Sequence, residues 1–122
     1  MIKVELIHKK DKLFGFKVYG HSGYDISGRD IVCAAVSSIT QSVIIGLNKV
    51  ICDNFCYCVD KKKPLVYVNI SDYKESDIEK AQILLNTFKY TLRELVNEYR
   101  NYIKIEMKED NGDEVWYPVI CI

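Results

Sequence analysis

Two segments near the start of the chain alternate between apolar and polar residues. In residues 2–9, Val4 and Leu6 alternate with polar neighbours, and residues 13–19 form a second run of the same kind. A period of two is typical of a strand with one buried face. Because only a short polar turn separates the two runs, the pattern predicts an opening β-hairpin.

The hydrophobic period changes after Asp30. Apolar residues then recur at spacings of three or four, which places them on one face of a helix. They are Val32, Val36, Ile39, Val43, Leu47 and Val50. Asp30 is a good N-cap residue, so we expect a helix from Ile31 onward. Cys33, Ser37 and Gln41 follow one another at intervals of four on a neighbouring face.

The second half of the chain repeats the order of two strands and a helix. Strands are expected around Phe55–Val59 and Leu65–Ile70, joined by the polar turn Asp60–Pro64. After the helix, Tyr102–Lys108 is a last predicted strand. The final segment, Val115–Ile122, is either a tail or a short strand.

The second helix has a clear apolar face but an ambiguous start. Its apolar face consists of Ile78, Ala81, Leu85, Phe88, Leu92, Leu95 and Tyr99. Ser76 and Glu79 fit a capping box, in which each side chain bonds the backbone N–H of the other residue. The helix can also begin at Asp72, and the periodicity does not decide between the two.

The order of elements indicates the fold class. Hairpin-connected strands, two helices and short loops favour an α+β domain in the order ββαββαβ. Its two helices pack on one mainly antiparallel sheet. The chain has 122 residues and no visible linker, so we expect one domain, residues 1–122.

Composition and charge narrow the classes of function. Apolar residues make up 48% of the chain, and 17 basic residues balance 17 acidic ones. Direct nucleic-acid binding is not required, because phosphate-backbone binding as a main activity needs an excess of positive charge. The start of the chain lacks the features of a signal peptide, and no run of apolar residues has the length of a membrane span. We therefore expect a cytoplasmic protein without membrane partners.

The cysteines are expected to be reduced thiols in that compartment. They are Cys33, Cys52, Cys56, Cys58 and Cys121, an odd number that a disulfide framework would not use up. Most free cysteines are buried apolar residues without a chemical role.

Cys33 stands in a setting that favours reactivity. If Asp30 caps the helix, Cys33 lies in the first turn, where unpaired N–H groups and the helix dipole stabilise a thiolate. A nucleophilic cysteine needs a base, and His21 precedes it in a loop with three glycines, Gly20, Gly23 and Gly28. Such a loop can return the chain from a strand end to the helix start, within reach of Cys33.

Neighbouring polar residues have alternative interpretations. Asp30 either caps the helix or also orients the imidazole of His21, and capping is the simpler role. Ser37, one turn after Cys33, can line a pocket. Tyr24 in the loop either touches a peptide or anchors the loop to the core.

These residues resemble the signature of the ribosomal-processing cysteine protease family, Prp. The resemblance lies in Gly20–Gly23 and, over ten consecutive positions, in Gly28–Ser37. By position it implies Cys33 as the nucleophile and His21 as the general base and acid. Asp30 and Ser37 match accompanying polar positions, while Ser22 stands where the family more often has alanine.

The family resemblance also implies a substrate. It implies a homodimeric endopeptidase, without a cofactor, that removes the N-terminal extension of a large-subunit ribosomal protein after a short apolar, aromatic-rich segment. The loop Gly20–Arg29, with Gly20, Ser22, Gly23, Tyr24 and Gly28, would then cover the substrate. The alternative is a ribosome-associated binding module without catalysis, which would use the lysine turn 61–63 and exposed aromatic residues.

The cysteines of the second half can in principle bind a metal ion. Cys52, Cys56 and Cys58 lie close in sequence, but zinc commonly takes four ligands, and no fourth cysteine or histidine lies nearby. We therefore expect these cysteines to be structural and expect no metal site.

Overall fold

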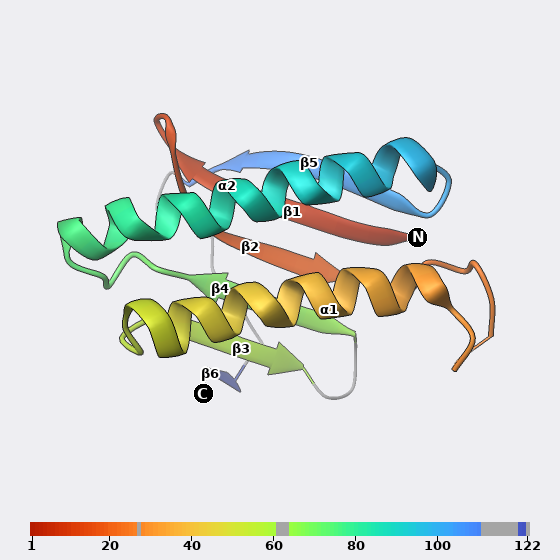
Figure 1. Ribbon diagram of the computed structural model, residues 1–122, viewed down its shortest axis with the longest axis horizontal. Helices are drawn as coiled ribbons and strands as arrows, with labels where there is room; N and C mark the ends of the chain where they lie inside the picture. The colour runs from red at the N-terminus through yellow and green to blue at the C-terminus, as the bar shows by residue number, and fades with distance from the viewer. Residues whose placement is uncertain (27, 61–63, 111–119, 122) are drawn as a thin grey trace.

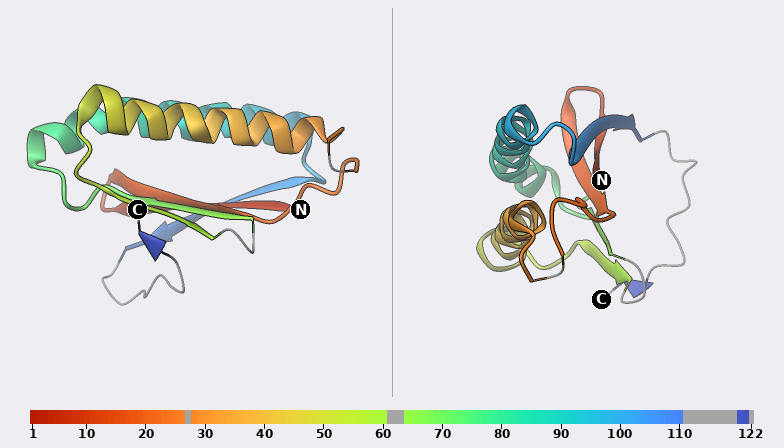
Figure 2. Two further views of the ribbon diagram at one scale, coloured as in Figure 1. Left: turned by 90° about the horizontal axis from the view of Figure 1, so that it is seen from below. Right: turned by 90° about the vertical axis from the view of Figure 1, so that its right-hand side faces the viewer.

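Two helices cover one face of a six-stranded sheet in the computed structural model (Figure 1). The structure describes residues 1–26, 28–60, 64–110 and 120–121. Figure 2 shows the two layers from the side, with both helices on the same face of the sheet. The predicted turn lysines 61–63 and most of the predicted segment Val115–Ile122 lie outside the described residues.

The sheet has the strand order β5-β1-β2-β4-β3-β6. The strands are β1 (Ile2–Lys9), β2 (Lys12–Tyr19), β3 (Cys56–Asp60), β4 (Leu65–Asn69), β5 (Ile103–Glu109) and β6 (Ile120–Cys121). Every pair is antiparallel except β1 with β5. The predicted α+β fold and the order ββαββαβ are confirmed, and β6 adds a two-residue strand at the β3 edge.

Helix α1 (Ile31–Ile45) continues directly into a π-helical segment, η1 (Gly46–Ile51). Val32, Val36, Val43 and Leu47 are buried as predicted, but Val50 is 80% exposed. The wider π-helical turn changes the angle between successive side chains, so the apolar spacing no longer points to one face. By length and hydropathy alone, helix 31–51 could cross a membrane, and 33% of that window is buried within the domain.

Helix α2 (Glu75–Glu98) begins before the predicted capping box, so that prediction is wrong. Its N-cap is Lys74, which makes no side-chain capping bond. The chain is held just before this point by Tyr73, whose buried hydroxyl donates to the backbone carbonyls of Leu47 at 2.9 Å and Cys52 at 2.6 Å. This anchor fixes where the helix starts, and Ser76 consequently lies inside the first turn.

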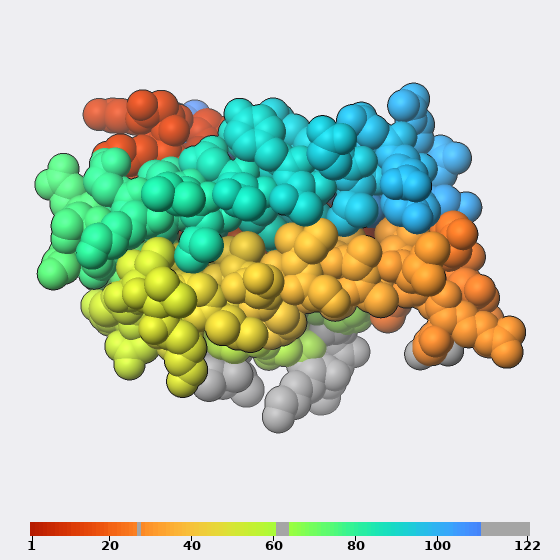
Figure 3. All heavy atoms as spheres, viewed as in Figure 1, coloured from red at the N-terminus to blue at the C-terminus, as the bar shows by residue number. Residues whose placement is uncertain are grey.

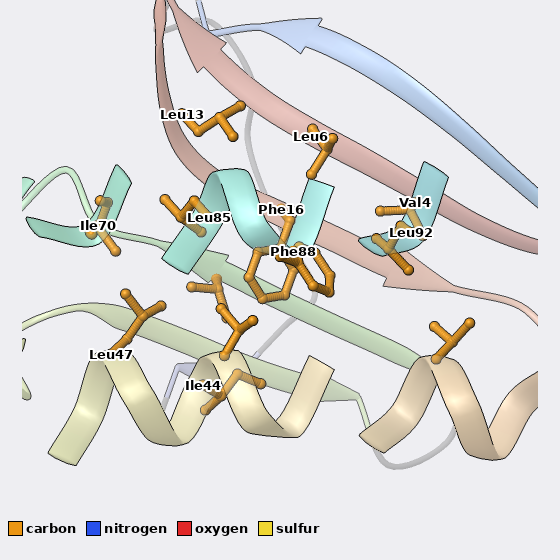
Figure 4. Close-up of a cluster of buried hydrophobic side chains, with 14 of the residues drawn as sticks. Val4, Leu6, Leu13, Phe16, Ile44, Leu47, Ile70, Leu85, Phe88 and Leu92 are labelled. Atoms are coloured by element: carbon orange, nitrogen blue, oxygen red, sulfur yellow. The ribbon is translucent and has the colours of Figure 1, made fainter. Parts of the chain in front are cut away.

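The core lies between the helices and the sheet (Figure 4). At its centre the rings of Phe16 on β2 and Phe88 on α2 have centroids 4.5 Å apart. Both side chains are at most 1% exposed. Full burial of a side chain of this size stabilises the fold by about 1.5–3 kcal/mol. These contacts fix α2 on β2, and α1 lies antiparallel beside it (Figure 3).

Gly15 marks the closest approach of two strands. A Cβ atom placed on Gly15 would lie 2.0 Å from the backbone carbonyl oxygen of Val68 on β4. Because that oxygen belongs to the backbone of the neighbouring strand, Gly15→Ala should force β2 and β4 apart. We expect a loss of about 3 kcal/mol or more in the free energy of unfolding, measured by urea denaturation.

Gly23→Ala is the matched control for this prediction. Gly23 has a φ of +72°, but among the described residues no atom other than those of its chain neighbours lies within 4 Å of the position that a Cβ would take, so backbone strain is what opposes the substitution. That strain should cost about 1–2 kcal/mol. Equal losses in the two variants would contradict a steric role for Gly15.

Candidate active site

The start of α1 carries Cys33. Asp30, the N-cap residue, has extended backbone angles and its Oδ1 accepts from the Cys33 backbone N–H at 2.9 Å. The predicted cap is therefore present. It places the partly buried Cys33 side chain in the first turn, beside the positive end of the helix dipole.

The segment that carries His21 leaves β2 at a fixed angle. Gly20 has a φ of +90°, and a Cβ atom there would lie 2.5 Å from the backbone oxygen of Met1. Its N–H donates to the Pro64 carbonyl at 3.0 Å. Only glycine fits this position. The exposed His21 follows it and lines a cavity together with Asp30 and Cys33.

Ser22 links this segment to the helix. Its backbone N–H donates to the Cys33 Sγ at 3.5 Å, and its hydroxyl donates to Oδ2 of Asp30. The hydroxyl also accepts from the Tyr24 N–H at 3.1 Å. The Ser22 hydroxyl, followed by the Cys33 N–H, lowers the pKa of the Asp30 carboxyl to about 2, so Asp30 is ionised at neutral pH.

Two cavities meet at Cys33. One, of about 360 Å³, lies over the sheet and is lined by apolar side chains that include Val18, Val36, Val59, Leu65 and Val66. The other, of about 440 Å³, lies under the loop and is lined by Gly23, Asp25, Gly28, Asp30 and Ala34. His21, Cys33 and Ser37 line both cavities.

The structure brings most of the predicted site residues together. His21 and Cys33 share both cavities, but no hydrogen bond between their side chains occurs among the described residues. Asp30 bonds Cys33 and Ser22 rather than His21, which favours the capping interpretation. Ser37 lines the cavities as predicted, whereas Gln41 lines neither.

The loop is anchored by its tyrosine. The Tyr24 ring makes edge-to-face contacts with Tyr99 and Tyr102, with centroids 5.9 and 5.2 Å apart. These residues connect the end of α2 to β5, so the loop lies against the end of the helical layer (Figure 3). This contact favours the anchoring interpretation of Tyr24.

Sequence reasoning missed several residues that line the site. Val59 and Leu65 come from β3 and β4, which the chain places beside α1 only through sheet pairing. Asp25 lies in the loop and lines the cavity under it together with Gly28, where the chain bends with a φ of +90°. The glycine pattern is the one signal in the sequence that points to this bend.

The remaining cysteines differ from their prediction in one respect. Cys33 and Cys52 are free thiols, and the Cys56 Sγ lies 3.3 Å from the Cys58 Sγ. Cys58 is disulfide-bonded, so the expectation of five reduced cysteines is wrong for this residue. In the sheet register the backbone of Cys58 lies opposite that of Cys121 in β6. Within the described residues no group of three or more metal-ligating side chains could hold a metal ion.

A cysteine at a helix start, with a histidine beside it at the junction of two cavities, is the arrangement of a thiol hydrolase. The sequence profile of the family Cysteine protease Prp matches residues 1–104. The chain belongs to this family and is a cysteine protease. No curated protein matches the chain.

Solved structures of the same fold agree with this assignment. The chain is 22% identical to a ribosomal processing protease Prp from S. aureus in complex with a covalently linked product peptide, with a TM-score of 0.77 over 88% of this chain and 100% of that chain. The structure of the same protease with a substrate peptide is 20% identical, with a TM-score of 0.73 over 88% of this chain and 100% of that chain. SMU.848 from Streptococcus mutans is 24% identical to the chain, with a TM-score of 0.74 over 89% of this chain and 95% of that chain. These likenesses show the fold.

Proposed function

We propose that this cysteine protease removes the N-terminal extension of a large-subunit ribosomal protein precursor during ribosome assembly. Cys33 is the nucleophile and His21 the general base and acid. The observation that carries the proposal is the placement of both side chains at the junction of the same two cavities, with Cys33 in the first turn of α1. The resemblance of Gly20–Gly23 and Gly28–Ser37 to the family signature supports the assignment of roles.

The reaction follows from these positions. His21 takes the thiol proton, and the Cys33 Sγ attacks the scissile carbonyl carbon. The Cys33 N–H already donates to Asp30. The other N–H groups in the first turn of α1 stabilise the negative oxygen. The C–N bond then breaks, and the proton from His21 goes to the leaving amine. A water molecule, deprotonated by His21, attacks the thioester and releases the acid and the thiol.

The two cavities would divide the substrate. The apolar cavity over the sheet suits the apolar, aromatic-rich segment before the cut, whose acyl group becomes attached to Cys33. The cavity under the loop, whose lining includes Asp25 and Asp30, suits the side of the leaving amine. Peptide complexes of the S. aureus relative support a peptide substrate in this fold.

The test uses the precursor ribosomal protein encoded in the same genome. Incubation with the purified protease should convert the precursor to one shorter form, with a single new N-terminus after the apolar segment, read by intact mass. The same mixture with other precursor proteins is the control. Binding to the precursor or to ribosomal particles without any cleavage would favour the binding module and overturn the proposal.

The proposal includes an assembly state and a compartment. We expect a cytoplasmic homodimer that works without a cofactor. Light scattering should therefore report about twice the chain mass of 14.2 kDa, and dialysis against a chelator should leave cleavage unchanged. A monomeric and fully active protein would contradict the dimer.

A further inference from the structure

Ser22 is the one buried residue among the described residues of the loop 20–29. Its side chain is 4% exposed, while its neighbours His21, Gly23 and Tyr24 are all exposed. Burying a hydroxyl is unfavourable unless its hydrogen bonds are satisfied. Here the hydroxyl donates to Asp30 Oδ2 and accepts from the Tyr24 N–H, so both of its functions are used.

The same residue contacts the thiol through its backbone. The Ser22 N–H donates to the Cys33 Sγ at 3.5 Å, while Asp30 also receives the Cys33 N–H. Ser22, Asp30 and Cys33 therefore form a closed ring of contacts between the loop and the first turn of α1. A donor aimed at sulfur favours the thiolate over the thiol.

We propose that Ser22 is a positioning residue of the protease, whose hydroxyl ties the His21 segment to Asp30 and keeps the Ser22 N–H directed at Cys33. This inference rests on the proposed role of Cys33 as the nucleophile. The hydroxyl acts on the thiol by holding the Ser22 N–H donor in place beside the Cys33 Sγ.

The contact also limits the position of His21. On one side of His21, the Gly20 N–H is bonded to Pro64; on the other side, Ser22 is bonded to Asp30. His21 is therefore held between two fixed neighbours, one on the sheet and one on the helix. The imidazole can rotate about its side-chain bonds while its backbone stays beside Cys33.

Other charged or titratable groups also face Cys33. His21, Asp25 and Asp30 line the cavity under the loop, and Tyr19 and Asp60 line the cavity over the sheet. Among these, Asp30 is the group that Ser22 contacts directly. Loss of the Ser22 hydroxyl should therefore release the His21 segment from Asp30 and displace the Ser22 N–H from the Cys33 Sγ, which makes the thiol less reactive.

The test compares Ser22→Ala with Ser38→Ala. Ser38 lies on the same helix as Cys33 but faces the groove between α1 and α2, away from both cavities. The measurement is the pH dependence of iodoacetamide labelling at Cys33, followed by peptide mass spectrometry so that Cys52 and Cys56 are counted separately. Ser22→Ala should slow labelling at pH 7 by about tenfold and leave labelling at high pH nearly unchanged, because the displaced Ser22 N–H no longer stabilises the thiolate. Ser38→Ala should leave the profile unchanged.

A second variant tests whether the effect of Ser22→Ala requires the Asp30 carboxylate. Asp30→Ser keeps a good N-cap residue but removes the carboxylate. In that background Ser22→Ala should slow labelling much less than in the unchanged chain. A Ser22→Ala variant with an unchanged labelling profile would overturn the proposal, and so would an equal effect in both backgrounds. Labelling reads the thiol whether or not the protein cleaves the precursor, so failure of the proposed substrate would show only in the cleavage assay.

Discussion

Cys33→Ala should abolish cleavage of the precursor, lowering kcat/KM by about 10⁴-fold or more. The reason is covalent: without the sulfur no thioester can form, and the remaining N–H groups can only polarise the carbonyl. Cys33 is partly buried in the first turn of α1, where removal of one sulfur atom leaves the cap contact between Asp30 and the Cys33 backbone N–H intact. The measurement is the rate of precursor conversion by intact mass, together with a melting curve.

The control for this result is Cys52→Ala. Cys52 is also a free thiol, but its contact with Tyr73 is made by its backbone carbonyl, which alanine keeps. That variant should therefore cleave at close to the unchanged rate. Residual cleavage at the unchanged rate in Cys33→Ala would remove Cys33 from the mechanism. A comparable loss in Cys52→Ala would point to a defect of folding.

The elements that depend on local pattern could be predicted from the sequence. The helical spacing from Val32 to Leu47 follows from one buried face. The alternation in residues 2–9 predicted the strand, although Glu5 and Ile7 on its other face are buried as well. The prediction for Val50 failed because the helix changes to a π-helical turn at Gly46. A π-helical turn depends on packing against other elements, and spacing alone does not contain it.

The predicted start of α2 failed for a tertiary reason. The residues from Ser76 match the capping-box pattern. The buried hydroxyl of Tyr73, however, bonds the carbonyls of Leu47 and Cys52 at the end of the first helical segment. This contact joins residues that are 26 and 21 positions apart. A long-range anchor of this kind outweighs a local signal of about 1 kcal/mol.

The residues of the candidate site also fall into those that a local pattern predicts and those that depend on the fold. Asp30 and Cys33 could be predicted, because an N-cap and its first turn are local features. The apolar cavity could not, because it needs Val59 and Leu65 from strands that reach α1 through sheet pairing. Ser22 was visible only as a departure from the family pattern, and its burial against Asp30 required the fold.

His21→Ala should lower kcat/KM for the precursor by about 10²–10⁴-fold while leaving the thermal stability nearly unchanged. The side chain is exposed and lines both cavities at Cys33, so its removal deletes no core packing. The step that suffers most is release of the amine, which needs a proton at the moment the C–N bond breaks. An activated ester of the same peptide has a leaving group that needs no proton, and its hydrolysis should therefore fall much less than precursor cleavage.

His8→Ala separates this role from a general effect of losing a histidine. His8 lies at the end of β1, where its Nδ1 lies 3.2 Å from the Lys10 carbonyl oxygen and the ring lines neither cavity. It should cleave both substrates at the unchanged rate. A His21→Ala variant that lost ester and precursor hydrolysis equally would show that His21 serves Cys33 only before acylation. Unchanged precursor cleavage in His21→Ala would contradict any role for His21. The only other histidine in the chain is His8.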